Sequence, residues 1–257
     1  MLEFEIDANI LSNKLKSISY IINGIDNKSL LAILKIQVAN NRAIFSLSGA
    51  SDRANIYIEC TTISEGECYI IASSFISILQ TLTGIITLQL LDNQLIIKQT
   101  DLCIKLATCT CFGLFDGIPT NQSFEKVASI PIEQLSDMAL LTIPFVNTES
   151  NNSTKGVCLR FGNNATKAIS CNGPSLAFAN YKSETLLDAT SVVLRPETLS
   201  ALRKVFANES VEIYTSSSAI KVVNSNGEVY AAQLNGTYPP LERIITFFNK
   251  KVRFVSF

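Results

Sequence analysis

The sequence predicts an α+β protein built of two similar halves, each with antiparallel sheets and two short helices. Alternation of apolar and polar residues dominates the chain, and the alternating segments come in pairs joined by residues that favour tight turns. The same order of segments occurs twice, about 124 residues apart, a repeat length typical of a domain rather than of a solenoid unit. We therefore expect two tandem domains, residues 1–124 and residues 125–257.

Four pairs of alternating segments predict β-hairpins, because Asn, Asp and Gly at the connections suit tight turns. The pairs are Leu31–Val38 with Ala43–Ser48 around Asn40 and Asn41, Leu88–Leu91 with Leu95–Lys98 around Asp92 and Asn93, Cys158–Phe161 with Thr166–Ser170 around Gly162–Asn164, and Lys221–Val223 with Glu228–Ala232 around Asn226 and Gly227. These pairs make the protein mostly antiparallel β.

Two segments in each half have apolar residues at helical spacing. They are Ile10–Ile18, Phe75–Leu82, Leu135–Ala139 and Leu199–Phe206. Ser73 is the expected N-cap of the second helix, and Pro196 and Glu197 suit the first turn of the fourth. We expect Phe124–Ala128 to join the halves.

Composition limits the classes of function. The chain has 47% hydrophobic and 17% charged residues, enough apolar material for two cores, and its net charge of −1 excludes a polycation that holds nucleic acid by bulk charge. The sequence contains no apolar stretch long enough to span a membrane and starts without a basic signal region, so we expect a cytoplasmic protein. The seven cysteines form no CxxC pair and are expected to be reduced, small apolar residues.

The absence of histidine argues against an enzyme. With no histidine in the chain, Ser-His-Asp sites, Cys-His sites and most zinc sites are excluded. Ser218 and Lys221 have the SxxK spacing but fall at a hairpin, and Cys109 and Cys111 share a strand face without further nearby ligands. No phosphate-binding glycine motif occurs either, so we expect no catalytic site, no metal and no cofactor.

The order of segments resembles the bacterial sliding clamp, the β subunit of replicative DNA polymerase III, over nearly the whole chain. The local sequences that carry the resemblance are Leu30–Leu34 before a hairpin, Ser51 and Asp52 where the family has Thr-Asp, Gly66–Cys68 leading into the second helix, Cys171–Ala177, and the closing turns Gly117–Pro119 and Gly236–Pro239. The resemblance implies the clamp fold, with sheets on the outside and helices on the inner face of a ring.

The resemblance also implies a function, a non-enzymatic processivity factor that encircles duplex DNA and tethers a DNA polymerase, with a clamp loader as a further partner. Such a ring needs only weak, sequence-independent phosphate contacts, so DNA affinity should have a shallow salt dependence. The residues expected to face DNA are Lys14 and Lys16 on the first helix, Lys28 in the loop before Leu30, and Arg203 and Lys204 on the fourth helix.

Partners of the family insert short peptides with apolar anchors into a pocket between domains. Carried over to this sequence, the second-domain wall of that pocket consists of Thr154, Cys171, Gly173, Pro174, Ser175, Leu176 and Thr246. Pro174 and Ser175 replace a histidine and an arginine of the family, which puts binding of the usual motif in doubt.

The chain departs from the family in having two predicted domains instead of three. Residues 251–257 resemble the strand that opens each repeat, at Leu2–Ile6 and Val127–Pro131, so a third repeat starts without continuing. Two explanations stay open: a native two-domain clamp that closes as a homotrimer, which we favour, or a shortened three-domain clamp. The alternative function is a clamp-like interaction module without ring closure that binds or inhibits a clamp, a loader or a polymerase. An enzyme with an unrecognised site comes third.

Overall fold

The computed structural model of the chain describes residues 2–23, 32–49, 52–110, 123–149, 152–162, 164–182, 184–185, 190–206 and 209–239. Within these ranges the first half of the chain contains nine strands and two helices, and the second half repeats that order.

The elements of the first half are β1 (Glu3–Asp7), α1 (Ala8–Asn23), β2 (Ile33–Ala39), β3 (Arg42–Ser48), β4 (Asp52–Glu59), β5 (Thr61–Ser64), β6 (Gly66–Ile71), α2 (Ala72–Leu79), β7 (Ile85–Leu91), β8 (Gln94–Gln99) and β9 (Leu102–Ala107). Those of the second half are β10 (Glu125–Pro131), α3 (Ile132–Thr142), the 3-10 turns Ile143–Phe145 and Ser153–Lys155, β11 (Val157–Gly162), β12 (Ala165–Cys171), β13 (Leu176–Lys182), β14 (Glu184–Thr185), β15 (Thr190–Leu194), α4 (Pro196–Phe206), β16 (Ser210–Thr215), β17 (Ala219–Asn224) and β18 (Gly227–Ala232).

The strand pairing repeats as faithfully as the order. The first half forms a sheet β5-β1-β7-β8-β9 and a row β4-β3-β2-β6, and the second half forms β14-β10-β16-β17-β18 and β13-β12-β11-β15. Adding nine to each strand number of the first half therefore gives its counterpart in the second. The expected α+β class, with antiparallel sheets and four helices, is confirmed.

The two halves are joined by a sheet that runs through both of them. Strand β18 of the second half pairs antiparallel with β4 of the first, which makes one nine-stranded sheet. Most of the buried apolar side chains form one core that includes residues of both halves, from Phe4, Phe45 and Phe75 to Phe161 and Phe206. The halves are therefore packed as one continuous body.

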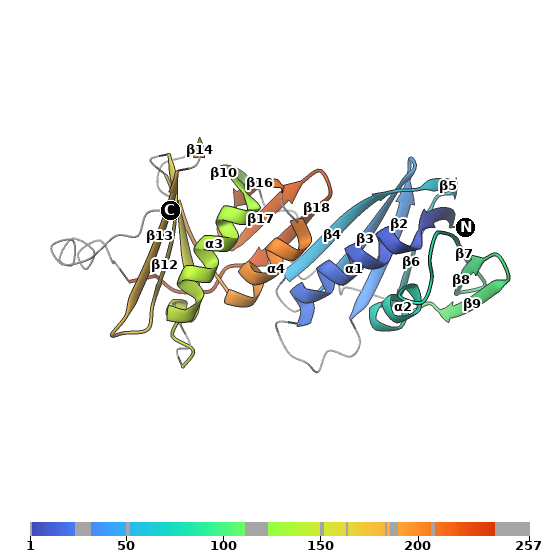
Figure 1. Ribbon diagram of the computed structural model, residues 1–257, viewed down its shortest axis with the longest axis horizontal. Helices are drawn as coiled ribbons and strands as arrows, with labels where there is room; N and C mark the ends of the chain where they lie inside the picture. Colours follow the sequence, from blue (N-terminus) through green and yellow to red (C-terminus); the bar gives the residue numbers. More distant parts are fainter. Residues whose placement is uncertain are drawn as a thin grey trace.

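The helices form a row in the order α2-α1-α4-α3, with α1 and α4 in contact across the junction of the halves. Figure 1 shows α3, α4 and α1 following one another along the length of the molecule. Helices α1, α3 and α4 also pack on strands of the nine- and four-stranded sheets, so each helix buries one face and leaves the other exposed.

Local chemistry explains why the predicted hairpins form. Asn40 and Asn41, and likewise Asp92 and Asn93, have positive φ angles, 51° and 58° and 49° and 59°. Two consecutive left-handed residues make the tight turn that matches the twist of the adjoining strands, and Asn and Asp tolerate that conformation. The first three predicted hairpins are confirmed, as β2–β3, β7–β8 and β11–β12.

The fourth hairpin, β17–β18, turns one residue earlier than predicted. Ser225 and Asn226 form the connection, and Gly227 is the first residue of β18. A Cβ at position 227 would collide with the carbonyl oxygen of Asn55 in β4, so this glycine serves the close approach of two strands.

The predicted N-cap of α2 and the predicted linker were wrong. Helix α2 starts at Ala72, one residue before Ser73, because β6 leads directly into it and the Ala72 amide donates to the Ala32 carbonyl at 2.9 Å. The segment expected to join the halves, Phe124–Ala128, lies largely in β10, whose end leads directly into α3. Pro196 and Glu197 do begin α4 as predicted.

Candidate DNA-facing helices and partner groove

The cations predicted to face DNA lie on α1 and α4, the two helices that meet at the junction of the halves. Lys16 and Arg203 are exposed to solvent. Lys204 is also exposed, but its amine lies 3.3 Å from the centre of the Tyr20 ring on α1, a cation–π contact that joins the two helices. Lys28 lies outside the described residues.

Lys14 is held by protein groups. Its amine donates to the Asn226 side-chain oxygen at 3.1 Å and lies 3.5 Å from the Tyr57 carbonyl oxygen. Burial lowers the pKa of this amine, and the charge of Glu209 acts in the opposite direction. Lys14 thus connects α1 to the β17–β18 turn of the other half, and its contact with phosphate stays a prediction.

The exposed faces of the other two helices carry no positive charge. Neither α2 nor α3 contains a lysine or arginine. Helix α3 instead exposes two acids, Glu133 and Asp137, and two large apolar side chains, Leu140 and Leu141, which are 62% and 47% exposed. The positive charge of the helix row is therefore concentrated near its middle, on α1 and α4.

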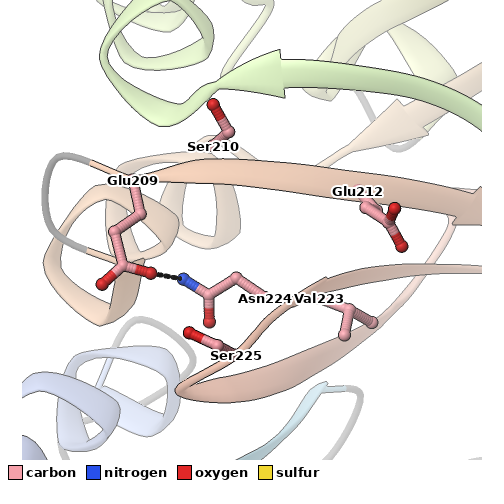
Figure 2. A pocket seen from close by; sticks show the side chains of 6 residues that line it. All are labelled: Glu209, Ser210, Glu212, Val223, Asn224 and Ser225. Atoms are coloured by element: carbon pink, nitrogen blue, oxygen red, sulfur yellow. Dashed lines mark hydrogen bonds between the residues drawn. The ribbon is translucent and has the colours of Figure 1, made fainter.

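A polar depression beside this junction is occupied by side chains that bond to each other. Figure 2 shows Glu209, Ser210, Glu212, Val223, Asn224 and Ser225 around it. Glu209 accepts hydrogen bonds from the side-chain amides of Asn224, at 2.6 Å, and Asn226. Glu212 accepts from Lys126 and Tyr214, and the hydrogen bond from Lys126 is the main reason that the pKa of this carboxyl is lowered.

The two acids of this depression form hydrogen bonds within the second half of the chain. Each carboxylate accepts from an amide, an ammonium or a phenol of the same half, so both serve the local structure. Among the described residues no group of three or more Cys, Asp or Glu side chains is placed to hold a metal ion. Ser218, the serine of the SxxK spacing, lies just before β17 in a hairpin turn, as expected.

The junction of the halves also contains a buried carboxylate that sequence reasoning did not single out. Asp52, 1% exposed at the start of β4, accepts a 2.6 Å hydrogen bond from the Thr198 hydroxyl on α4. The Arg195 guanidinium lies 3.9 Å from the other carboxylate oxygen. Sequence analysis used Asp52 only as a family marker, because its partners are more than a hundred residues away in the chain.

A second set of polar side chains links β4 and β18. The Asn55 amide donates to Glu228 at 2.7 Å, and Lys221 forms an ion pair with the same carboxylate at 3.0 Å. Burial alone would raise the pKa of Glu228, but the hydrogen bonds from Asn55 and Lys221 outweigh it and lower the pKa below the ordinary 4.5. Together with Asp52, these contacts fix the two halves against each other.

Part of the predicted partner pocket is assembled by the fold. Cys171 and Leu176, paired across β12 and β13, pack with Leu234 and Tyr238 around a small apolar cluster separate from the main core. The other members of this cluster are Cys158, Ile169 and Val193. We refer to the surface formed by Cys171, Leu176, Leu234 and Tyr238 as the partner groove.

The remaining predicted pocket residues lie around this groove. Gly173 and Pro174 are exposed in the β12–β13 turn, where Gly173 has a φ of +96° that favours glycine. The Ser175 amide donates to the Asn172 side chain at 3.1 Å and closes that turn. Thr154 is half-buried in the 3-10 turn next to Ser153, and Thr246 lies outside the described residues.

Leu234 and Tyr238 are the groove residues that sequence analysis did not predict, and Tyr238 served there only as a marker of the closing turn. Tyr238 is the more buried of the two. Its side chain is 8% exposed, and its hydroxyl has no hydrogen bond of good geometry within the described part of the chain. Burial, and then the nearby Cys171 thiol, raise the pKa of this hydroxyl far above its ordinary value. The Ser153 hydroxyl donates to the Thr237 carbonyl at 3.0 Å and anchors the segment that carries Tyr238.

Comparison with known proteins gives matches among solved structures. The DNA polymerase III beta chain of Streptococcus pneumoniae superposes with a TM-score of 0.83 at 21% identity, over 95% of this chain and 68% of that one. The chain has the fold of the bacterial sliding clamp. The Bacillus subtilis sliding clamp matches with a TM-score of 0.82 at 17% identity, over 95% and 67% of the two chains. The Helicobacter pylori beta clamp bound to a DNA ligase peptide matches at 0.78 and 18%, over 94% and 69%.

The likeness is one of structure rather than sequence. No family model and no curated protein matches the chain. At these identities the superpositions establish the clamp fold, and the chain spans about two thirds of the length of the matched clamps. No helix among the described residues is long and apolar enough to cross a membrane.

Proposed function

We propose that this protein is a DNA sliding clamp, a non-enzymatic, cytoplasmic processivity factor that closes around duplex DNA and tethers a DNA polymerase. The observation that carries the proposal is the likeness to polymerase III beta clamps over 95% of the chain, combined with the internal repeat that places four helices in one row. Topological linkage needs no active site, which agrees with a sequence that lacks histidine.

The repeat supports a division into two domains, residues 1–124 and 125–257, joined through β4 and β18. If six such domains are needed to surround DNA, three chains close the ring, and we propose a homotrimer. The third-repeat-like strand at 251–257 lies outside the described residues.

DNA contact in this proposal is weak and local. Exposed Lys16 and Arg203 are the best placed cations of the helix row, whereas the amines of Lys14 and Lys204 already have protein partners. Few phosphates are then neutralised, so the salt dependence of DNA affinity should be shallow. A weak hold suits a protein that must slide.

Partner binding is proposed for the groove around Leu176 and Tyr238. The Helicobacter pylori clamp of similar fold was solved with a DNA ligase peptide. In this chain the half-exposed apolar side chains of Cys171, Leu176 and Leu234 would take an apolar anchor of an extended peptide, and the buried Tyr238 side chain would support them from below. The polymerase and the clamp loader are the expected sources of such peptides.

The alternative, an interaction module without ring closure, is favoured by one observation. Helix α3 exposes Glu133, Asp137, Leu140 and Leu141, a face suited to protein contact rather than to phosphate. Such a module would bind a clamp, a loader or a polymerase without encircling DNA.

Retention on circular DNA separates the two functions. The protein is assembled on nicked circular DNA at high concentration, passed through a sizing column, and the DNA is then cut at one site. A clamp elutes with the circle and is released within minutes of cutting, while a module shows no dependence on DNA topology. Retention that is unchanged by linearisation would overturn the clamp proposal.

A further inference from the structure

A cleft of about 800 Å³ lies where segments of both halves meet. Its walls are α1, the β2–β3 turn, the adjoining end of β4, and the β17–β18 turn. A volume of this size is typical of sites for small molecules, which occupy about 300–1,000 Å³. We refer to it as the junction cleft, and it shares no residue with the partner groove. Six of its lining residues are Ile10, Lys14, Asn40, Arg42, Tyr57 and Glu59.

Lys14 lines the cleft without a carboxylate in direct contact. Among the described residues its amine has two partners, both neutral oxygens, the Asn226 side chain at 3.1 Å and the Tyr57 carbonyl at 3.5 Å. The half-buried Lys35 and Lys221 show the usual arrangement, since each forms an ion pair with a glutamate. Burial lowers the pKa of Lys14, as expected for an ammonium that has lost water without gaining an anion beside it. An anion in the cleft would supply that charge.

Arg42 lines the same cleft and is also without a carboxylate. It stands opposite Glu59 in the β3–β4 pairing, yet the two side chains form no ion pair with each other. Its guanidinium lies 4.1 Å from the centre of the Tyr57 ring, a cation–π contact. Burial, and then the neighbouring Glu228 carboxylate, raise the pKa of the Tyr57 hydroxyl to about 12, so this ring stays neutral beneath the guanidinium.

The two cations converge on one place in the structure. Both contact Tyr57, Lys14 at its carbonyl and Arg42 at its ring. Both also contact the β17–β18 turn, where the Arg42 guanidinium lies 3.5 Å from the Ser225 carbonyl oxygen and Lys14 bonds to Asn226. A guanidinium fork beside an ammonium is a combination that suits a phosphate group, because the fork matches two of its oxygens and the ammonium adds a compact charge.

The internal repeat shows that the fold does not require these charges. Lys14 is the seventh residue of α1, and the seventh residue of α3 is Met138. Arg42 begins β3, and its counterpart β12 begins with Ala165. The second half therefore builds the same helix and hairpin without either cation, so the pair serves the cleft of the first half.

We propose that the junction cleft binds a small phosphate ester, with the phosphate between Lys14 and Arg42. The organic part of the ligand would lie against Ile10, which is 51% exposed, and the exposed side chain of Asn40 would offer it hydrogen bonds. This inference does not depend on ring closure, because one chain supplies the whole cleft.

Charge and helix geometry favour a small ligand over a nucleic acid strand. The exposed carboxylate of Glu59 also lines the cleft, so a polyanion would place its further phosphates beside a negative charge. Lys16, the exposed cation proposed to face DNA, is two residues from Lys14 and therefore about 200° around the helix from it. The cleft and the proposed DNA-facing surface thus lie on different sides of α1.

Calorimetric titration of the full-length protein tests the site, with AMP as the phosphate ester and adenosine and inorganic phosphate as comparison probes. We expect AMP to bind more tightly than either, and adenosine to show no binding at millimolar concentration. Arg42→Gln removes an exposed charge and should weaken AMP binding about tenfold or more. Lys98→Gln, at an exposed lysine of β8 outside the cleft, is the matched control and should leave AMP affinity within about twofold.

A second measurement uses the unmodified protein and so does not depend on the folding of a variant. Trace acetylation of lysines, read by mass spectrometry of peptides, reports the accessibility of each amine. AMP should slow acetylation of Lys14 and leave that of Lys98 unchanged. Adenosine should protect neither.

Each contrary result overturns a stated part of the proposal. Equal affinity for AMP and adenosine, or unchanged AMP affinity in Arg42→Gln, would refute phosphate recognition by this pair. Absence of AMP binding and of Lys14 protection would refute the site. Phosphate binding as tight as that of AMP would refute the contribution of the organic part, and stronger protection of Lys14 by duplex DNA than by AMP would assign the cleft to DNA. None of these results bears on retention by circular DNA, which tests the clamp function separately.

Discussion

Replacement of Asp52 tests whether the buried carboxylate fixes the two halves of the chain to each other. Its side chain is almost fully buried at the start of β4, and both of the partners described above belong to the second half. Asp52→Ala removes the acceptor of the Thr198 hydroxyl, which is itself 2% exposed. The Thr198 hydroxyl is then buried without the carboxylate that accepts its hydrogen bond.

The expected cost follows from the two contacts. A hydrogen bond to a charged group contributes about 1.5–3 kcal/mol, and its loss leaves a buried donor without its partner. The ion pair with Arg195 spans 3.9 Å and its guanidinium side chain is 31% exposed, so solvent screening limits it to about 0.5–1 kcal/mol. Asp52→Ala should therefore lower the free energy of unfolding by about 2–4 kcal/mol.

Urea unfolding followed by circular dichroism measures this change. Asp137→Ala, at an exposed acid of α3, is the control and should cost less than about 0.5 kcal/mol. In a double-mutant cycle, Asp52→Asn and Thr198→Val should show a coupling of about 1–2 kcal/mol. If the free energy of unfolding of Asp52→Ala lies within about 0.5 kcal/mol of that of the parent, which is about the measurement error, the carboxylate does not hold the halves together.

Three further predictions concern charge, pH and the partner groove. Lys16→Ala should reduce the slope of log DNA affinity against log salt concentration by about 0.9. Glu133→Gln on α3 should raise DNA affinity with little change of this slope. An unchanged slope for Lys16→Ala would show that Lys16 does not contact DNA. The lowered pKa of Glu228 contributes stability that is fully present above pH 4.5, the ordinary pKa, and is lost as pH falls through the pKa of the folded state. Glu228→Gln should therefore make the fall of the unfolding free energy below pH 4.5 less steep. An equally steep fall in the variant would contradict this. Tyr238→Phe should stabilise the protein by about 1 kcal/mol, because it removes a buried hydroxyl that has no hydrogen bond of good geometry within the described residues; destabilisation in thermal unfolding would show that the hydroxyl is satisfied.

The fold could be predicted further than the site. Hairpins such as the one around Asn40 and Asn41 are specified locally, since side chains that tolerate positive φ occur between alternating segments. The start of α2 could not be predicted, because the carbonyl that accepts the hydrogen bond of its first amide belongs to Ala32, far earlier in the chain.

The site depends on contacts that sequence does not show. Lys14 and Lys204 are predicted to face DNA from their positions on helices alone. That reasoning cannot show their contacts with Asn226 and Tyr20, which form only across the junction of the halves. Tyr238 likewise gained its place in the groove by packing against Cys158 and Val193 from other strands. Helical position predicts which side chains are exposed, whereas tertiary packing decides which exposed groups have partners.

The internal junction explains why the two halves form one continuous body. The β4–β18 contact combines strand pairing with the buried Asp52–Thr198 bond, the Asn55–Glu228 bond and the Lys204–Tyr20 contact.

The most direct test of the central claim is to assemble the protein on nicked circular DNA, remove free protein on a sizing column, and then cut the circle at one site. A ring that encircles DNA elutes with the circle and is released when the DNA is cut. The proposed function predicts both retention and release. Retention that does not change when the circle is cut would contradict the claim that this chain encircles DNA.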